Sequence, residues 1–450
     1  MVIAAVAPLG ATAVVIPTVF ALSGNASAAL YFIAAAIILS LFAVGYTLTS
    51  RHVHNAGAFY TYVQAGLGKL MGAGAASLAL ISYAALLISL FAYFGVAASN
   101  AAMSFLGVSI DWWVFAFTAI LLVAFLGYRD VEVSAKVLGV VLVLEVMAIL
   151  VIDLAIVARG GASGLSVQPL DPRKILDGAP GLGLMFAFFA FFGFEATAVF
   201  RSEAKNPQRT IPRATYASVA FIGVLYAFTS WAQAMGVGPN RVAAVAAEDP
   251  AKLMPNLSAE YVGSAMSDAV QILLVTSIFA CALSFHNVVA RYQYNLARGG
   301  LLPTLLGEVS AKHRAPSRSS LTVTVLAGAI LALLAIVGLD PVTQIYTWLS
   351  GSASLGIIVL MALTSLSVVV FHWRGGGNDP IWNSTVAPIL SLIGLLLVLY
   401  LAVDNLDLLV GSGTAATIVL IALFACFFVG VTVAAINRAR RPESYERMLS

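Results

Sequence analysis

The sequence predicts an all-α polytopic membrane protein with about twelve transmembrane helices. Of its 450 residues, 61% are hydrophobic and 10% are charged, whereas a soluble protein carries about 25% charged residues. The apolar residues form runs long enough to cross a bilayer, and short polar turns separate these runs. Nearly the whole chain is used in this way, so no soluble domain is expected. The predicted spans are residues 2–22, 29–49, 70–103, 112–128, 137–158, 181–200, 215–237, 263–289, 321–337, 343–371, 386–403 and 414–436.

The basic residues predict the orientation of these spans. If both termini face the cytoplasm, 18 of the 23 Lys and Arg residues fall on the cytoplasmic side. Such an imbalance follows the positive-inside rule and requires an even number of spans. The basic residues left on the outer side are Arg159, Arg173, Lys174, Arg241 and Lys252.

The span at 181–200 is the first candidate for a functional site. It contains one charged residue, Glu195, and Gly193 stands just before the Phe194–Glu195 pair. An ionised carboxylate in hydrocarbon is costly and is usually functional. Glycine lets the backbone leave helical geometry, and a helix broken at the midplane exposes amides and carbonyls that can bind a polar solute. The alternative is a continuous helix with a packing glycine and a neutral glutamate.

The first span is a second candidate for a broken helix. It contains Pro8, Gly10 and Pro17. Because Pro8 lacks a backbone donor and Gly10 loosens the chain, a break is expected near Pro8 to Ala11. A kinked but continuous helix is the alternative.

Two acidic residues interrupt the span at 137–158. Glu145 and Asp153 are eight residues apart and therefore share roughly one helix face. Asp153 is near the outer end, where it can simply contact water. Glu145 lies deeper, where a carboxyl group either binds and releases a proton or stays protonated and bonds to a neighbouring helix.

The sequence gives no support for enzyme chemistry. It contains none of the CxxC, HExxH, P-loop or dinucleotide-binding patterns. Cys281 and Cys426 both fall in apolar stretches and are expected to be packed thiols. We therefore expect no cofactor, no metal site and no nucleic-acid partner.

Three motifs resemble those of the amino acid–polyamine–organocation (APC) transporter superfamily. The segment FFGFEATAVFRSEAKNPQRTIPRAT at 191–215 resembles its sixth helix and the adjoining cytoplasmic loop. NAGAFYTYVQAGLG at 55–68 resembles its third-helix entry, and RYQYNLARGGLLP at 291–303 resembles the end of its eighth helix. In this last motif Gly299 replaces an acidic residue. The family's glycine-rich signature in the first span is only partly present, as PLGAT at 8–12.

The resemblance implies two inverted five-helix repeats whose first helices are broken. The repeats would comprise residues 1–158 and 181–371, joined by an outer loop at 159–180. Helices 11 and 12 would follow at 372–437, and a basic cytoplasmic tail at 438–450. Family members carry a longer inner half-helix than the seven residues before Pro8 allow. Either the start is internal, or this protein has a shortened inner gate.

The resemblance also implies a substrate site where the two broken helices meet. The substrate carboxylate would bind amides of the first span, and its amino group would bind carbonyls of the sixth. Phe189 would act as an outer gate, and the Tyr83 hydroxyl either reaches the substrate or bonds to a neighbouring backbone group. Glu145, where some proton-coupled relatives carry a lysine, and Glu195 would couple transport to protons. The predicted substrate-binding residues are Pro8, Leu9, Gly10, Ala11, Tyr83, Phe189, Phe191, Phe192, Gly193 and Phe194.

These expectations describe a secondary active transporter for an amino acid or a related amine. The protein would work in the cell (plasma or inner) membrane by alternating access, with a proton gradient as the driving force. The partners would be the small-molecule substrate and the lipid bilayer, and the oligomeric state is left open. The alternatives are exchange against a counter-substrate without net proton flow, a nutrient sensor that does not transport, or a channel.

Overall fold

Apolar helices account for all twelve predicted spans. The computed structural model describes residues 7–53, 59–128, 135–194, 206–309, 316–375, 379–440 and 445. Within these ranges, nine helices are long and apolar enough to cross a membrane, and three shorter apolar helices lie at Pro8–Ser23, Trp112–Tyr128 and Pro180–Phe189. No strand occurs in the described ranges. The predicted fold class is thereby confirmed.

The helices of the spans have the following bounds, in chain order. The first span consists of α2 (Pro8–Gly10), a π-helical turn (Ala11–Val15) and α3 (Ile16–Ser23); then come α4 (Ala28–Thr49), α6 (Lys69–Leu106), α7 (Trp112–Tyr128), α8 (Ala135–Ala158), α9 (Pro180–Phe189), α11 (Pro207–Val237), α14 (Ser264–Arg298), α15 (Ser317–Ile336), a π-helical turn (Pro341–Tyr346) with α16 (Thr347–Trp373), a second such turn (Trp382–Val386) with α17 (Ala387–Asp404), and α19 (Gly413–Arg440).

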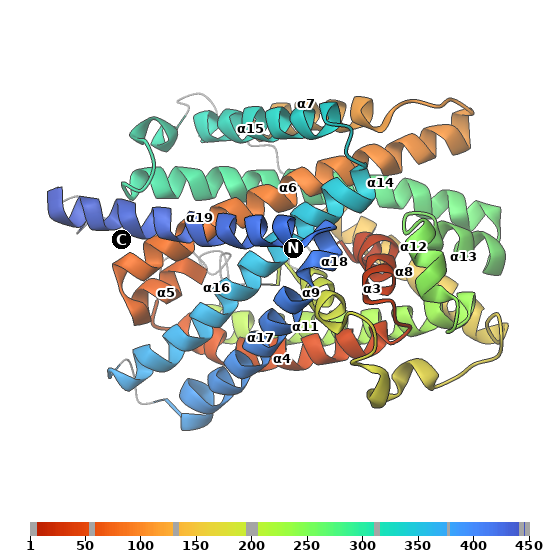
Figure 1. Ribbon diagram of the computed structural model, residues 1–450, viewed down its shortest axis with the longest axis horizontal. Helices are drawn as coiled ribbons and strands as arrows, with labels where there is room; N and C mark the ends of the chain where they lie inside the picture. Colours follow the sequence, from red (N-terminus) through yellow and green to blue (C-terminus); the bar gives the residue numbers. More distant parts are fainter. Residues whose placement is uncertain are drawn as a thin grey trace.

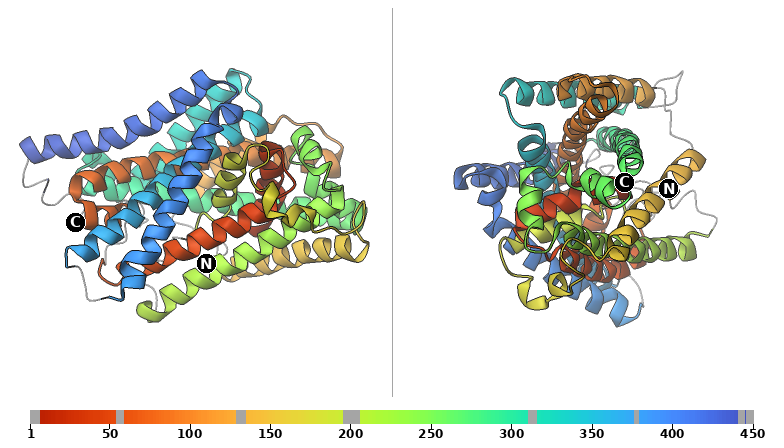
Figure 2. Two further views of the ribbon diagram at one scale, coloured as in Figure 1. Left: turned by 60° about the horizontal axis from the view of Figure 1, so that its bottom comes forward. Right: turned by 90° about the vertical axis from the view of Figure 1, so that its right-hand side faces the viewer.

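The first and sixth spans occupy the centre of the bundle. Every residue of α9 is buried, as is every residue of the π-helical turn at Ala11–Val15. Figure 1 shows α3 and α9 side by side, with α4 and α17 on one side and α6 and α14 on the other. In α19, by contrast, only Ala416, Gly430 and Ala434 are buried. It packs along α6 at the edge of the molecule (Figure 2). Its exposed apolar side chains suit contact with lipid.

The first span is irregular close to the position that proline and glycine predicted. Ala7 has a left-handed backbone, with φ of 45°. From Pro8 onward the residues are helical, so the break expected near Pro8 to Ala11 lies at the N-terminal edge of that segment. Proline fits the first turn of a helix because its missing N–H needs no partner there. The following π-helical turn leads into Pro17, whose missing N–H disturbs regular α-helical bonding.

The sixth span is interrupted where glycine predicted an interruption. α9 ends at Phe189, and residues 190–194 form a turn in which Gly193 has φ of 108°. Positive φ of this size favours glycine. The alternative of a continuous helix through Gly193 is therefore wrong. Glu195 lies outside the described residues.

Short helices cover the bundle end that is predicted to face outward. The stretch at 238–262, expected as a hydrophilic loop, contains α12 (Val242–Glu248) and α13 (Leu253–Tyr261). α12 packs on α3, and α13 packs on α14. The loop at 159–180 contains two short 3-10 helices (Gln168–Leu170 and Pro172–Lys174). It is bound to the end of the first span, because the Ala179 amide donates to the Ser23 carbonyl at 2.9 Å. At the opposite end, α5 (Phe59–Leu67) lies between α4 and α6 in the chain, and a 3-10 helix (Thr304–Gly307) follows α14. The short helix α18 (Leu406–Val410) lies between α17 and α19.

Candidate functional site

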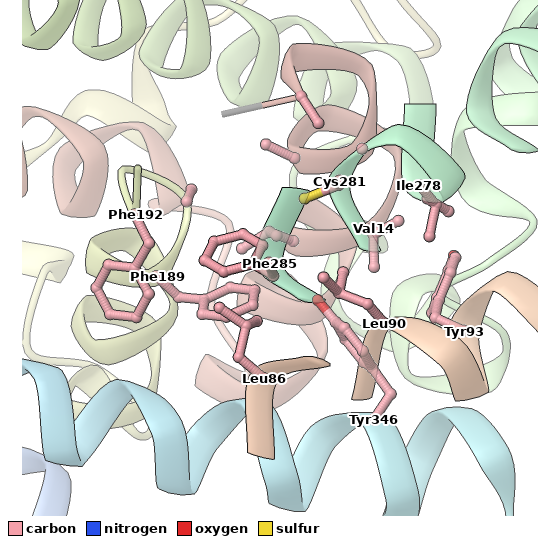
Figure 3. Close-up of a pocket in the computed structure, with 15 residues that line it drawn as sticks. Val14, Leu86, Leu90, Tyr93, Phe189, Phe192, Ile278, Cys281, Phe285 and Tyr346 are labelled. Carbon is pink, nitrogen blue, oxygen red and sulfur yellow. The ribbon is translucent and has the colours of Figure 1, made fainter. Parts of the chain in front are cut away.

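A small cavity lies between the two interrupted spans. It has a volume of about 60 Å³, which is room for a few water molecules. The first span, α6, α9 and the turn after it, α14 and the turn before α16 all contribute to its wall (Figure 3). No charged side chain of the described residues lines it. The lining residues are Ala7, Gly10, Ala11, Val14, Val15, Leu86, Leu90, Tyr93, Phe189, Ala190, Phe192, Ile278, Cys281, Phe285 and Tyr346.

Aromatic rings form much of this wall. The ring centroids of Phe189 and Phe192 are 5.4 Å apart, and those of Phe189 and Tyr346 are 6.5 Å apart. Tyr93 lies beside Tyr346, with 5.1 Å between ring centroids. In Figure 3 the Tyr346 hydroxyl points toward the centre of the cavity. Such edge and tilted arrangements are favourable for aromatic pairs, so the rings support one another around the cavity.

Glu145 reaches the first span directly behind this wall. Its Oε2 accepts a hydrogen bond of 3.1 Å from the Leu9 backbone amide. The Glu145 side chain comes from α8 and is buried, with only 3% of the residue exposed. Leu9 itself does not line the cavity, but Gly10 and Ala11 do. The carboxyl group therefore binds the N-terminal turn of the same helix that forms one side of the cavity.

Polar groups of two other helices surround the Glu145 carboxyl group. The Ser277 hydroxyl of α14 lies against it. Tyr226 of α11 and Cys281 of α14 are within electrostatic range of it. Cys281 also lines the cavity, whereas Glu145 does not. Glu145 is thus close to the cavity without opening into it.

Asp153 is buried, and its predicted contact with water is wrong. None of its surface is exposed. Its Oδ2 accepts a hydrogen bond of 2.6 Å from the Thr229 hydroxyl on α11. Its Oδ1 has no hydrogen-bond partner among the described residues. The residue lies only five positions from the end of α8, but α11 covers it, which the sequence position alone does not reveal.

Gln233 provides a second contact from α11 to the first span. Its Nε2 donates to the Thr12 carbonyl at 2.8 Å. Thr12 belongs to the π-helical turn. Gln233, Tyr226 and Thr229 were not predicted from the sequence, although their spacing places them on one face of α11. Together with Glu145 and Asp153 they make a buried polar contact zone between α8, α11 and the first span.

The predicted substrate-binding residues divide into three groups. Gly10, Ala11, Phe189 and Phe192 line the cavity. Pro8, Leu9 and Gly193 belong to the interrupted segments but not to the cavity wall. The remaining three pack elsewhere: Phe191 contacts Tyr226, Phe194 contacts Phe42 and Tyr46, and Tyr83 stacks on Phe285 and contacts Tyr292. Their roles in binding remain predictions.

Most of the wall that faces the two interrupted spans was not predicted from the sequence. Leu86, Leu90 and Tyr93 come from α6, and Ile278, Cys281 and Phe285 come from α14. These helices are apolar on several faces, so no periodic pattern identifies the side that faces inward. Tyr346 at the start of the tenth span was missed for the same reason.

The fold defines a multi-pass membrane protein, and the comparisons with known proteins define a transporter of amino acids or amines and not an enzyme. A model of the family described as amino acid permease matches residues 1–436, and the chain belongs to this family. The resemblance to the APC superfamily is thereby confirmed.

Individual relatives are named for different substrates, and their sequence identity to this chain is modest. The low-affinity putrescine importer PlaP of Escherichia coli is 27% identical over 75% of this chain and 72% of its own length. The branched-chain amino acid permease BcaP of Bacillus subtilis is 23% identical over 88% of this chain and 86% of its own length. BcaP of Lactococcus lactis is 24% identical over 61% of this chain and 56% of its own length.

Proposed function

We propose that this protein is a proton-coupled secondary active transporter for an amino acid with an apolar side chain. It would import the substrate across the plasma membrane by alternating access, with both termini in the cytoplasm. The observation that carries this proposal is the hydrogen bond from the Leu9 amide to Glu145 beside the cavity. It connects a buried ionisable group to the helix end that would receive the substrate.

The contact between Glu145 and Leu9 supplies a mechanism for coupling. A helix N-terminus attracts negative charge, and an ionised Glu145 satisfies this preference before any substrate arrives. A substrate carboxylate at the same helix turn would be repelled by that charge. Protonation of Glu145 removes the repulsion and releases the Leu9 amide. Substrate and proton would therefore bind together, and loss of the proton on the inner side would help expel the substrate.

The cavity wall supports an apolar substrate side chain. Val14, Leu86, Leu90, Ile278 and several phenylalanines would exclude water from it. Burial of an aliphatic side chain of this kind is worth about 1.5–3 kcal/mol. The naming of two relatives as branched-chain amino acid permeases agrees with this choice.

An amine without a carboxylate is the second candidate. The aromatic faces of Phe189 and Phe192 could hold a cation, and one relative is named a putrescine importer. Two observations make this candidate weaker. The wall of the cavity carries no acidic side chain in the described residues, and the Leu9 turn presents amides, which bind anions.

Uptake by proteoliposomes that contain the purified protein distinguishes these candidates. Radiolabelled leucine, isoleucine and valine would be compared with putrescine and lysine, with an inward proton gradient. The proposal predicts saturable uptake of at least one aliphatic amino acid and none of putrescine. Uptake of putrescine alone would select the amine candidate. Uptake that requires preloaded substrate and does not respond to the gradient would indicate an exchanger.

A further inference from the structure

We propose that His52, His372 and Asp379 form a binding site for a divalent transition metal of the zinc type. The three residues lie outside the cavity wall, at the end of the bundle that is predicted to face the cytoplasm. His52 follows α4, His372 is in the last turn of α16, and Asp379 precedes the turn that leads into α17. Their ligand atoms all lie within 4.8 Å of one another.

The hydrogen bond of His372 Nδ1 determines whether Nε2 of the same ring can bind a metal ion. His372 Nδ1 lies 2.8 Å from the Val368 carbonyl oxygen. A carbonyl can only accept, so Nδ1 carries the proton, and in the neutral ring Nε2 presents a lone pair. That lone pair faces Asp379 Oδ2, another acceptor, at 3.4 Å. Both atoms are buried and have no hydrogen-bond partner in the described part of the chain. Two acceptors that face each other repel, and either a second proton on the ring, which makes His372 an imidazolium, or a metal ion between the two atoms relieves this repulsion.

The spacing of these atoms fits a metal ion better than a direct hydrogen bond. A charge-assisted N–H···O bond is about 2.7–2.9 Å long, clearly shorter than the 3.4 Å observed. Zinc binds histidine nitrogen at about 2.0–2.1 Å and carboxylate oxygen at about 2.0–2.2 Å, so two tetrahedral ligands lie about 3.4 Å apart. A ring N–H donated to a backbone carbonyl is also the usual second contact of a metal-binding histidine.

His52 completes a site with three protein ligands. Its Nε2 lies 3.7 Å from Asp379 Oδ2, and its ring packs at 88° to that of His372, with 5.8 Å between centroids. The His52 side chain is 32% exposed, whereas that of His372 is 3% exposed. A metal ion can therefore enter from the His52 side, and the short shift that His52 needs is available to a half-exposed side chain. Two histidines and one carboxylate are a common zinc ligand set.

A bound metal ion would join the predicted inner ends of three spans. The segment after α4 and the end of α16 also contact each other here through the rings of His52, Phe371 and His372, and the turn that leads into α17 packs on both helices. A ligand that binds only this arrangement stabilises it by mass action. Zinc is therefore expected to raise the melting temperature of the protein.

The test is zinc binding to the purified full-length chain without a histidine tag, after removal of metal with a chelator. Calorimetric titration with zinc sulfate is expected to give one site per chain, together with a higher melting temperature. His372→Ala and Asp379→Asn should each weaken binding at least about tenfold. Asp404→Asn, at the opposite end of α17, is the matched control and should bind like the wild type. Melting temperatures measured without zinc check that each variant is folded.

Two results would overturn the proposal. If the wild type binds no more zinc than Asp379→Asn does, the cluster is only an imidazolium–carboxylate pair. If His372→Ala and Asp379→Asn are folded and retain the site, the metal binds elsewhere, for example at histidines outside the described residues.

Discussion

The carboxylate of Glu145 accepts a hydrogen bond from the backbone amide of Leu9, a residue 136 positions earlier in the chain. This contact joins the middle of α8 to the first turn of the interrupted helix that borders the cavity. A carboxyl group at this position can give up its hydrogen bond to the helix when it takes up a proton. The same change alters how well that helix turn accepts a substrate carboxylate.

Substrate should protect Cys281 from thiol reagents. Cys281 lines the cavity, and Cys426 is the only other cysteine in the sequence. In a Cys426→Ser background, substrate at ten times its Kd should slow the reaction of Cys281 with a small methanethiosulfonate about tenfold, because the occupied fraction cannot react. Mass spectrometry of the labelled protein measures the rate. In the complementary Cys281→Ser background, the rate at Cys426 should not respond to substrate. An unchanged rate at Cys281 would place the substrate in a different part of the protein.

Thr229→Val should destabilise the protein through Asp153. The substitution keeps the side-chain volume but removes the hydroxyl that donates to Asp153 Oδ2. A buried acceptor that loses its partner costs about 1–3 kcal/mol, so the apparent melting temperature in detergent should fall. Thr276→Val is the control, since the Thr276 hydroxyl is exposed and, among the described residues, bonds to carbonyls of its own helix. Equal melting temperatures for the two variants would mean that the hydrogen bond from Thr229 to Asp153 does not stabilise the protein.

Gly66→Ala should destabilise the contact between α5 and α16. A Cβ at Gly66 would overlap the backbone oxygen and the hydroxyl of Ser367. The Gly66 amide also donates to that hydroxyl at 3.1 Å, and the Gly66 carbonyl accepts from Arg374 at 3.1 Å. Backbone atoms cannot move aside easily, and overpacking of this kind costs about 1–3 kcal/mol. Thermal unfolding in detergent measures the effect. Gly328→Ala, whose Cβ would meet only Ile120 at 4.0 Å, should unfold like the wild type; a comparable loss in both variants would refute the steric explanation.

The sequence predicted the spans because hydrophobic runs and charged turns mark membrane helices directly. The predicted span at 112–128 agrees with α7 at both ends, and the turn at Gly193 follows from the backbone freedom of glycine. The helices α12 and α13 were not predicted. Their stretch carries three prolines and several charged residues, which favoured a loop, and their packing on α3 and α14 gives them buried faces.

The site was only partly predictable, for a physical reason. A helix that is apolar all round gives no periodic signal for the side that faces the cavity, so Tyr93 and Tyr346 could not be identified. Phe192 was identified because it adjoins the glycine that interrupts its span, and Phe189 was identified from the resemblance to the APC superfamily. The Glu145–Leu9 contact depends on how α8 is rotated against the first span, and no local pattern encodes this rotation. The same holds for His52, His372 and Asp379, which three separate segments bring together.

The most direct test of the central claim is uptake by proteoliposomes with and without an inward proton gradient, for the wild type and for Glu145→Gln. Glutamine preserves the shape of the side chain but cannot bind and release a proton. The inward proton gradient should stimulate uptake by the wild type. The variant should bind substrate and exchange it against internal substrate, but its uptake should not respond to the gradient. Gradient-stimulated uptake that persists in Glu145→Gln would contradict the assignment of Glu145 as the proton site.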